Sequence, residues 1–231
     1  MSDEAAFLRA ICEHPDEDTP RLVFADWLDE QGDDANAAWA ELIRVQVPLA
    51  RGPGAEREKL VARERELLPT VVNTWFTRLK VSADLKWANW TRGFPLTLDG
   101  AGSVIRIARP AFAERVPLRE FNINAATDAD LIEFATWPEL QLVRKLGVWT
   151  ESYLTVAESG LVALFRCPHL RNLERLRIHR AAYTDAAMEA LLEAPYLDQL
   201  INVKIVGRGF GELSSDVQEL IRRRFGRHDI Y

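Results

Sequence analysis

A short pattern of hydrophobic positions occurs five times between residues 93 and 206. Each copy has three positions. Two residues separate the first position from the second, one residue separates the second from the third, and the second and third positions are apolar. These last two positions alternate with other residues, which is typical of a short strand buried on one side. The five copies are Gly93-Leu96-Leu98, Leu118-Phe121-Ile123, Val143-Leu146-Val148, Leu173-Leu176-Ile178 and Leu200-Val203-Ile205.

Helical segments separate these strands, and three of them end in the same way. Each ending places a proline two residues before a leucine. The three stretches are Phe134-Ala-Thr-Trp-Pro138-Glu-Leu140, Leu164-Phe-Arg-Cys-Pro168-His-Leu170 and Leu191-Leu-Glu-Ala-Pro195-Tyr-Leu197. Because one strand and one helix cannot bury their apolar faces alone, we expect the copies to stack into a solenoid with a continuous core.

The repeating unit resembles a leucine-rich repeat of the ribonuclease-inhibitor-like kind, in which a true helix lies on the convex side. The resemblance implies an α/β fold of about five strand–helix repeats, with a parallel sheet on the concave face. The chain departs from the family pattern at Gly93, which replaces the first apolar residue, and in the third repeat, which is longer. The usual Asn or Cys of the motif is not at a fixed offset.

The first fifty residues predict an all-helical segment. Thr19 is a suitable N-cap for a helix with Pro20 at its first position and its body from Arg21 to Gln31. A further helix is expected from about Asn36 to Ala50, and Pro48 is expected to bend or shorten its end.

The same segment resembles a known bacterial domain. Its longest matching run is Asp18-Thr-Pro-Arg-Leu-Val-Phe-Ala-Asp-Trp-Leu-Asp-Glu-Gln-Gly-Asp33, with Ala6-Phe-Leu-Arg-Ala-Ile11 before it and Glu41-Leu-Ile-Arg-Val-Gln46 after it. Over residues 3–50 the chain is similar to the bacterial repeat-companion domain, a short helical domain found ahead of repeat arrays. The resemblance implies an architecture, a helical module before leucine-rich repeats, and no catalytic activity.

The remaining segments predict a linker and two caps. Arg51-Gly-Pro-Gly54 indicates a linker. Glu56 to Leu68 predicts a charged helix ended by Pro69, and Val71 to Leu79 predicts another helix, which together would seal one end of the repeats. Ser214 to Phe225 predicts a helix that closes the other end. The expected domains are a repeat-companion module at 1–50, a linker and helical cap at 51–90, and a leucine-rich-repeat solenoid at 91–231.

The charge of the chain is unevenly distributed. The net charge is −6, but residues 1–50 hold twelve acids and three arginines, a balance of −9, so the rest carries +3. Overall acidity argues against general binding to duplex DNA, which needs a concentrated cationic surface.

Cys12 and Cys167 are far apart, which favours two reduced and buried thiols. No apolar run approaches the ~18 residues of a membrane span, and the chain starts with acidic residues, so we expect a cytoplasmic protein.

No motif of a catalytic, cofactor or metal site is found. The sequence has no phosphate-binding loop, no nucleophile elbow and no paired Cys-x-x-Cys, and its four histidines are scattered. We therefore expect no enzyme, no cofactor and no metal. The acids at 16–18 are either a cation site or, as we favour, a solvated turn. Asp26 is either a functional residue or, as we favour, the partner of Arg21 or Arg44 in an ion pair.

The strand period predicts which side chains face the concave side. If the two apolar positions of each strand point into the core, the positions before, between and after them point outward. The outward positions are Pro95, Thr97 and Asp99 in the first copy, Glu120, Asn122 and Asn124 in the second, Lys145, Gly147 and Trp149 in the third, Arg175, Arg177 and His179 in the fourth, and Asn202, Lys204 and Val206 in the fifth. The candidate site consists of Lys145, Trp149, Arg175, Arg177, His179, Lys204, Asn122 and Asn124.

This composition predicts a binding surface. An aromatic residue beside several arginines is enriched at binding hot spots, so we expect a non-enzymatic scaffold for a protein partner of unknown identity. Self-association, with the acidic first fifty residues on the basic face of another copy, is one form of this hypothesis. The alternative is RNA or single-stranded nucleic acid, with bases stacked on Trp149. A solvated sheet face with incidental charges is the third interpretation.

Overall fold

The computed structural model describes residues 3–80, 82–150, 156, 158–181, 183–206 and 212–225. The chain forms two compact units. The first comprises residues 1–83, 87–96 and 108–117, and the second comprises residues 84–86, 97–107 and 118–231. The predicted domain boundaries after residues 50 and 90 stay predictions.

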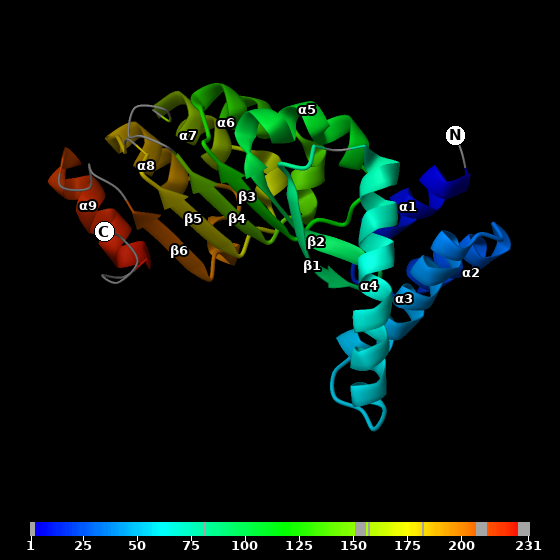
Figure 1. The fold of residues 1–231 in the computed structure, drawn as a ribbon. Coiled ribbons are helices and arrows are strands. Elements are labelled where there is room, and N and C mark those ends of the chain that lie inside the picture. The colour runs from blue at the N-terminus through cyan, green and yellow to red at the C-terminus, as the bar shows by residue number, and fades with distance from the viewer. Residues whose placement is uncertain are drawn as a thin grey trace. The chain divides into compact units, whose positions relative to one another are not determined.

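The described residues have an α/β fold with an open, mostly parallel, six-stranded sheet (Figure 1). The strand order is β1-β2-β3-β4-β5-β6, so consecutive strands are neighbours. The α-helices are α1 (Asp3–Glu13), α2 (Thr19–Glu30), α3 (Asp34–Ala50), α4 (Arg57–Leu79), α5 (Gly102–Phe112), α6 (Asp128–Phe134), α7 (Glu158–Phe165), α8 (Asp185–Leu192) and α9 (Ser215–Phe225). The strands are β1 (Lys86–Thr91), β2 (Phe94–Ala101), β3 (Glu120–Asn124), β4 (Lys145–Trp149), β5 (Arg175–His179) and β6 (Asn202–Val206). Short 3-10 helices are η1 (Pro138–Leu142), η2 (Pro168–Leu170) and η3 (Leu197–Gln199).

Aromatic rings form the core of the first unit. The Trp39 ring packs edge-on against Phe24 and Trp75, with centroid distances of 5.2 and 5.5 Å. The Trp39 indole Nε1 donates a hydrogen bond to the carbonyl oxygen of Gly93, at 2.8 Å. Arg92 and Gly93 have φ values of 49° and 83°, as a two-residue hairpin turn between β1 and β2 requires. Gly93 is thus a turn residue, and not the first apolar position of a repeat.

The structure contradicts the predicted cap of one helix and the predicted ends of two others in this unit. The N-cap of α2 is Asp18 and not Thr19, and α3 continues through Pro48 to Ala50, so Pro48 does not shorten it, while a bend at Pro48 stays a prediction. Pro69 does not end a helix either, because α4 runs through it to Leu79. Val71, Trp75 and Leu79 are buried at four-residue spacing on one side of α4, and this packing offsets the cost of about 3 kcal/mol for an interior proline.

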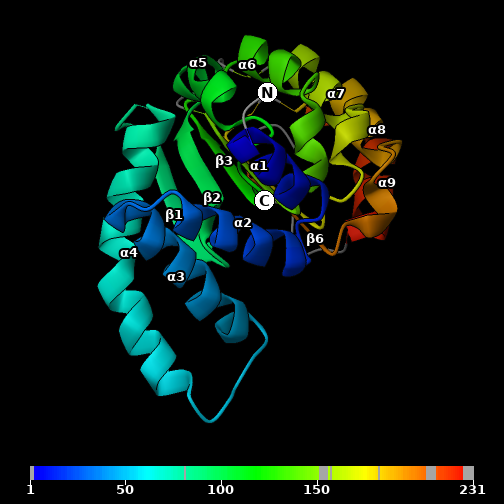
Figure 2. The same cartoon turned by 90° about the vertical axis from the view of Figure 1, so that its right-hand side faces the viewer.

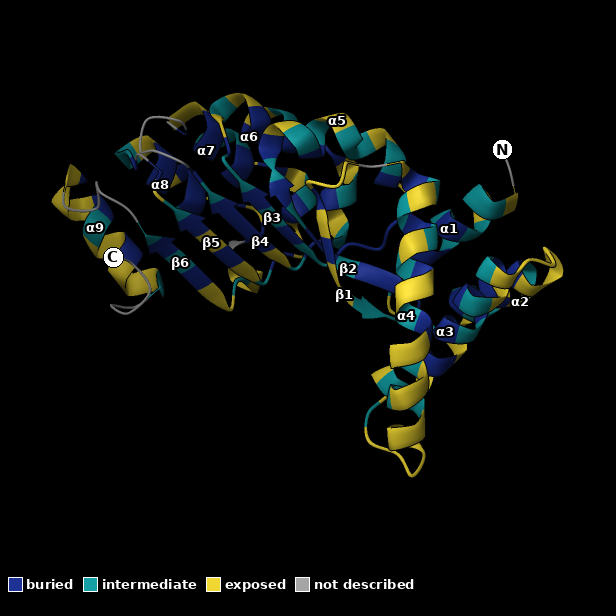
Figure 3. Ribbon diagram, viewed as in Figure 1, coloured by how far each residue is buried: buried dark blue, intermediate teal, exposed yellow. Residues whose placement is uncertain are grey.

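The predicted core register is confirmed in the second unit. Four parallel strands place Phe121 beside Leu146, Leu146 beside Leu176, and Leu176 beside Val203. The next inward row, Ile123, Val148, Ile178 and Ile205, is aligned in the same way. All eight side chains are buried, and Figure 3 shows the buried positions along these strands.

The predicted register of the first copy is wrong by two residues. Leu98 and Gly100 of β2, and not Leu96 and Leu98, lie beside Phe121 and Ile123. A Cβ atom on Gly100 would lie 2.5 Å from Leu85 Cδ2, so the Leu85 side chain fills the space that an apolar residue occupies in the other strands. The shift also moves the outward positions of β2, and Asp99 becomes the partner of Asn122.

Local features recur from strand to strand in the second unit. The amides of Lys145, Arg175 and Asn202, the first residues of β4, β5 and β6, each donate to a carbonyl just before the preceding strand, at 3.0, 2.9 and 3.2 Å. Thr127 and Thr184 cap α6 and α8 through equivalent side-chain hydrogen bonds. The helices α6, α7, α8 and α9 pack one against the next and follow one another in an arc (Figure 2).

None of the helices that the structure describes is long and apolar enough to span a membrane. The expected cytoplasmic location stays a prediction.

We predict that Phe121→Ala destabilises the chain by about 3–5 kcal/mol, because the ring is buried against Phe134 (5.5 Å between centroids) and its loss leaves a cavity. Ile132→Ala is the matched control, since Ile132 is 45% exposed and its change should stay within about 0.5 kcal/mol. Urea denaturation measures both free energies of unfolding. Equal losses for the two variants would contradict the assignment of Phe121 to the core.

Candidate functional site

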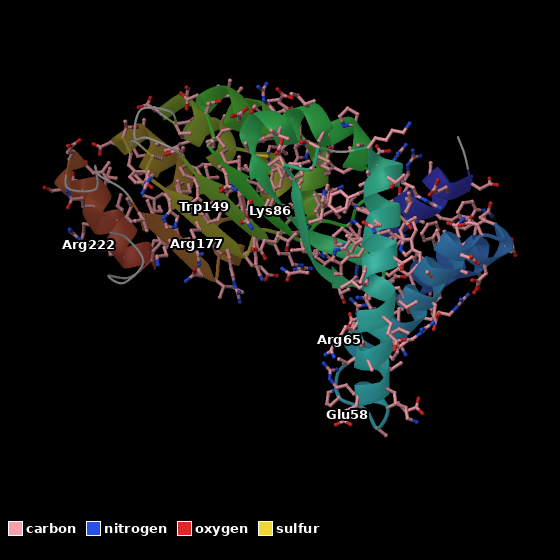
Figure 4. All side chains as sticks on the ribbon, in the orientation of Figure 1. Glu58, Arg65, Lys86, Trp149, Arg177 and Arg222 are labelled. Atoms are coloured by element: carbon pink, nitrogen blue, oxygen red, sulfur yellow. The ribbon has the colours of Figure 1, made fainter. Side chains whose placement is uncertain are left out.

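The outward side chains of the sheet line a hollow of about 430 Å³ in the second unit. Five of the eight predicted site residues lie in it: Asn122, Lys145, Trp149, Arg175 and Arg177. Asp99, Glu120 and Asn202 also line it, although they were not among the predicted site residues. Figure 4 labels Trp149 and Arg177, which belong to the neighbouring strands β4 and β5.

The other three predicted residues lie beside the hollow. Asn124 donates a hydrogen bond to Asp99 Oδ1, at 2.6 Å. His179 is the register partner of Trp149, and Lys204 is the register partner of Arg177. The structure therefore brings all eight residues to neighbouring positions on four strands, β3 to β6.

Two rows of side chains cross the strands in register. One row reads Thr97, Glu120, Lys145, Arg175 and Asn202. The other reads Asp99, Asn122, Gly147, Arg177 and Lys204. The shifted register of β2 corrects the predicted rows, which had Pro95 beside Glu120 and Thr97 beside Asn122. Asp99 now lies in the row of Asn122 and Arg177, so the acids gather on β2 and β3 while the cations lie on β4 to β6.

The cations of this face differ in their pairing. Glu120 is 3.6 Å from Lys145 Nζ and accepts a hydrogen bond from Asn122 at 3.3 Å. Within the described part of the chain, Arg175, Arg177 and Lys204 form no ion pair. Three neighbouring cations without counter-charges create a positive potential that favours an anionic ligand.

Trp149 is held in one orientation by its neighbours. Its ring stacks on the His179 imidazole, with a centroid distance of 5.7 Å and an interplanar angle of 15°. A Cβ atom on Gly147 would lie 2.2 Å from the edge of the same indole and 2.6 Å from Asn122 Oδ1. The lack of a side chain at Gly147 therefore lets the indole fold back across the sheet. The sequence pattern did not predict this role of Gly147. The only sign of it in the sequence is a glycine two residues before the tryptophan, at Gly147 and Trp149.

The pKa of His179 is lowered by its surroundings in the site. Partial burial lowers the pKa of His179 below its ordinary value of 6.5, and the nearby charges of Arg177, Lys204 and Arg180 lower it further. Its Nε2 atom is buried and has no hydrogen-bond partner in the described structure. The imidazole is therefore neutral at pH 7, which suits its stacking on Trp149.

Several acids of the N-terminal segment form ion pairs. Asp26 lies 2.6 Å from Arg44, so the predicted ion pair is confirmed with Arg44 as the partner. Asp18 lies 2.9 Å from Arg51 and 2.8 Å from Arg92. Among the described residues there is no group of three or more metal-ligating side chains.

Both cysteines are free and buried, as predicted. Burial raises the pKa of the Cys12 thiol to about 12 and also raises that of Cys167. The Cys167 thiol donates to the carbonyl oxygen of Ala135, at 3.1 Å. Because the thiolate is the reactive form, neither side chain is activated as a nucleophile.

The fold and this face define an α/β protein with an open, mostly parallel sheet that exposes ordered charges around a tryptophan. No family model matches the chain, and no curated protein is significantly similar to it. The likeness to repeat-companion domains and leucine-rich repeats therefore stays a resemblance.

We predict that His179 contributes less to stability at pH 5 than at pH 7.5. The pKa of His179 is lower in the folded chain than in the unfolded chain, so just below pH 6.5 the unfolded chain binds a proton at His179 and the folded chain does not. The free energy of unfolding therefore falls as the pH falls from 6.5 toward the pKa of the folded chain. His179→Gln should remove this part of the loss in urea denaturation at the two pH values, and His169→Gln, outside the hollow, is the control. Identical pH dependence in wild type and His179→Gln would contradict the lowered pKa.

We predict that Gly147→Ala displaces the Trp149 ring, because the added methyl group overlaps the indole. The His179 ring-current shift in NMR spectra should move toward its unstacked value, with destabilisation of about 1–3 kcal/mol. Gly54→Ala is the matched control, since a Cβ atom there meets nothing within 4 Å. An unchanged His179 spectrum in Gly147→Ala would contradict the stacked arrangement.

Proposed function

We propose that this chain is a non-enzymatic scaffold that binds a protein partner on the outward face of its sheet. The observation that carries the proposal is the group of cations without ion-pair partners, Arg175, Arg177 and Lys204, beside the oriented Trp149. A hollow of about 430 Å³ at this place is large enough to accept several side chains of a partner.

The proposed architecture is a leucine-rich-repeat solenoid of the ribonuclease-inhibitor-like kind behind a repeat-companion module. The aligned rows of Phe121, Leu146, Leu176 and Val203 support it, as do the equivalent backbone hydrogen bonds between successive strands. A stacked parallel sheet of this kind presents one continuous face, which suits the recognition of an extended partner surface.

The chemistry of the face suits protein recognition. Each guanidinium can form two parallel hydrogen bonds with one carboxylate, and such charge-assisted pairs are stronger than neutral ones. The indole of Trp149 offers apolar area without much entropy loss, because His179 and Gly147 already restrict it. Binding energy is expected to concentrate on these few side chains.

RNA or single-stranded nucleic acid is the second candidate, since cations beside an aromatic ring also bind phosphates and bases. Asp99 and Glu120 line the same hollow and would repel phosphates, which favours a protein partner. A salt series separates the two, because nucleic-acid affinity falls steeply with salt.

We predict that Arg175→Glu with Arg177→Glu removes the specific partner from affinity purifications analysed by mass spectrometry. Both arginines are exposed and unpaired within the described residues, so their reversal changes the face without breaking an internal ion pair. Arg166→Glu with Arg171→Glu makes the same change of net charge outside the hollow and should retain the partner. If both double variants recover the same proteins as the wild type, the proposed function is wrong.

A further inference from the structure

The charges of the outward face are ordered across the strands. Asp99 on β2 and Glu120 on β3 form an acidic end, and Arg175, Arg177 and Lys204 on β5 and β6 form a basic end. In the row of Asp99, the neutral positions of Asn122 and Gly147 lie between the two ends, with the Trp149 indole folded back over Gly147. In the row of Glu120, Lys145 lies between them, 3.6 Å from the Glu120 carboxylate. The two-residue shift of β2 brings Asp99 into the row of Asn122.

We propose that the hollow binds a partner segment with separate charge blocks, a basic block over β2 and β3 and an acidic block over β5 and β6. The inference rests on the proposed function and names the kind of partner that this face fits. An apolar residue between the two blocks would lie on Trp149.

The basic end requires an acidic block. Within the described residues, the three cations have no internal counter-ion, whereas Lys145 is already close to Glu120. Arg175 and Arg177 belong to one strand, two residues apart, so their guanidinium groups can bind neighbouring carboxylates. One carboxylate would leave the remaining positive potential uncompensated, and a short run of acids compensates it.

The acidic end requires a basic block. Asp99 accepts a hydrogen bond from Asn124, and Glu120 accepts one from Asn122. An ionised carboxylate has about four acceptor sites, so both side chains keep free capacity for a lysine or an arginine. A uniformly negative ligand would place its own charges against these two carboxylates and lose affinity there.

The size of the face limits the length of the segment. Neighbouring strands are about 4.8 Å apart, so the distance from β2 to β6 is about 19 Å. An extended peptide rises about 3.3 Å per residue, and a segment of about six residues therefore covers it. Two basic residues, a short apolar centre and two acidic residues fill this length.

Fluorescence anisotropy at low salt with four labelled probes tests the proposal. The probes are a peptide with a lysine block, a Pro-Leu centre and a glutamate block, a peptide of the same composition with alternating charges, an all-glutamate peptide with the same centre, and an oligouridine RNA. We expect the block peptide to bind about fivefold tighter than each of the other three. Tightest binding of the all-glutamate peptide or the RNA, equal binding of the block and alternating peptides, or no binding of any probe would each overturn the charge order.

Variants separate this inference from the proposed function. Asp99→Asn with Glu120→Gln keeps side chains that can bond to Asn124 and Asn122, and it should abolish the preference for the block peptide over the all-glutamate peptide. Arg175→Gln with Arg177→Gln should weaken both peptides, while Arg166→Gln with Arg171→Gln should weaken neither. If only the acidic pair has no effect, the charge order is wrong and the binding face stands. If the arginine pair affects neither the probes nor the purified partner, the proposed function fails.

Discussion

The in-register row of Phe121, Leu146, Leu176 and Val203 is the contact on which the rest of the second unit depends. Side chains of a strand alternate between its two faces, so burying one residue commits both of its neighbours to the opposite face. Hydrophobic burial thus decides the position of residues that are not hydrophobic at all. The cations and Trp149 lie together because the apolar residues between them are packed beneath the sheet.

The outward face of the sheet carries positive charges on β5 and β6 that are not neutralised by ion pairs within the described residues. These charges are those of Arg175, Arg177 and Lys204. Besides burial, the charges of Arg177 and Lys204 lower the pKa of His179. Exposure to water keeps the cost of these charges small, because solvent screens like charges at the surface. Trp149 is also restricted before any partner arrives, which reduces the entropy lost on binding. These features support the proposed binding of a partner on this face.

Three elements, α3, α4 and β2, show where local rules were outweighed by packing. Pro48 and Pro69 are helix breakers in isolation, yet α3 and α4 continue through them. Each proline removes one backbone hydrogen bond, whereas the buried side chains on both sides, such as Leu67 and Val71, hold the two halves against one core. In β2, the register does not follow the spacing of leucines, and Leu85 fills the space beside Gly100 that an apolar side chain occupies in the other strands.

The sequence by itself determined the strands from Phe121 onward and the face that each of them buries, and five of the eight site residues that it predicted line the hollow. It could do so because a period of two residues is a local property that needs no knowledge of neighbours. Only the tertiary structure decided the register of β2, the place of Asp99 beside Asn122, and the orientation of Trp149 over Gly147. These features depend on contacts between residues far apart in the chain, such as Leu85 with Gly100 and Trp149 with His179. No local pattern encodes such contacts, because their energy appears only when separate segments compete for the same space.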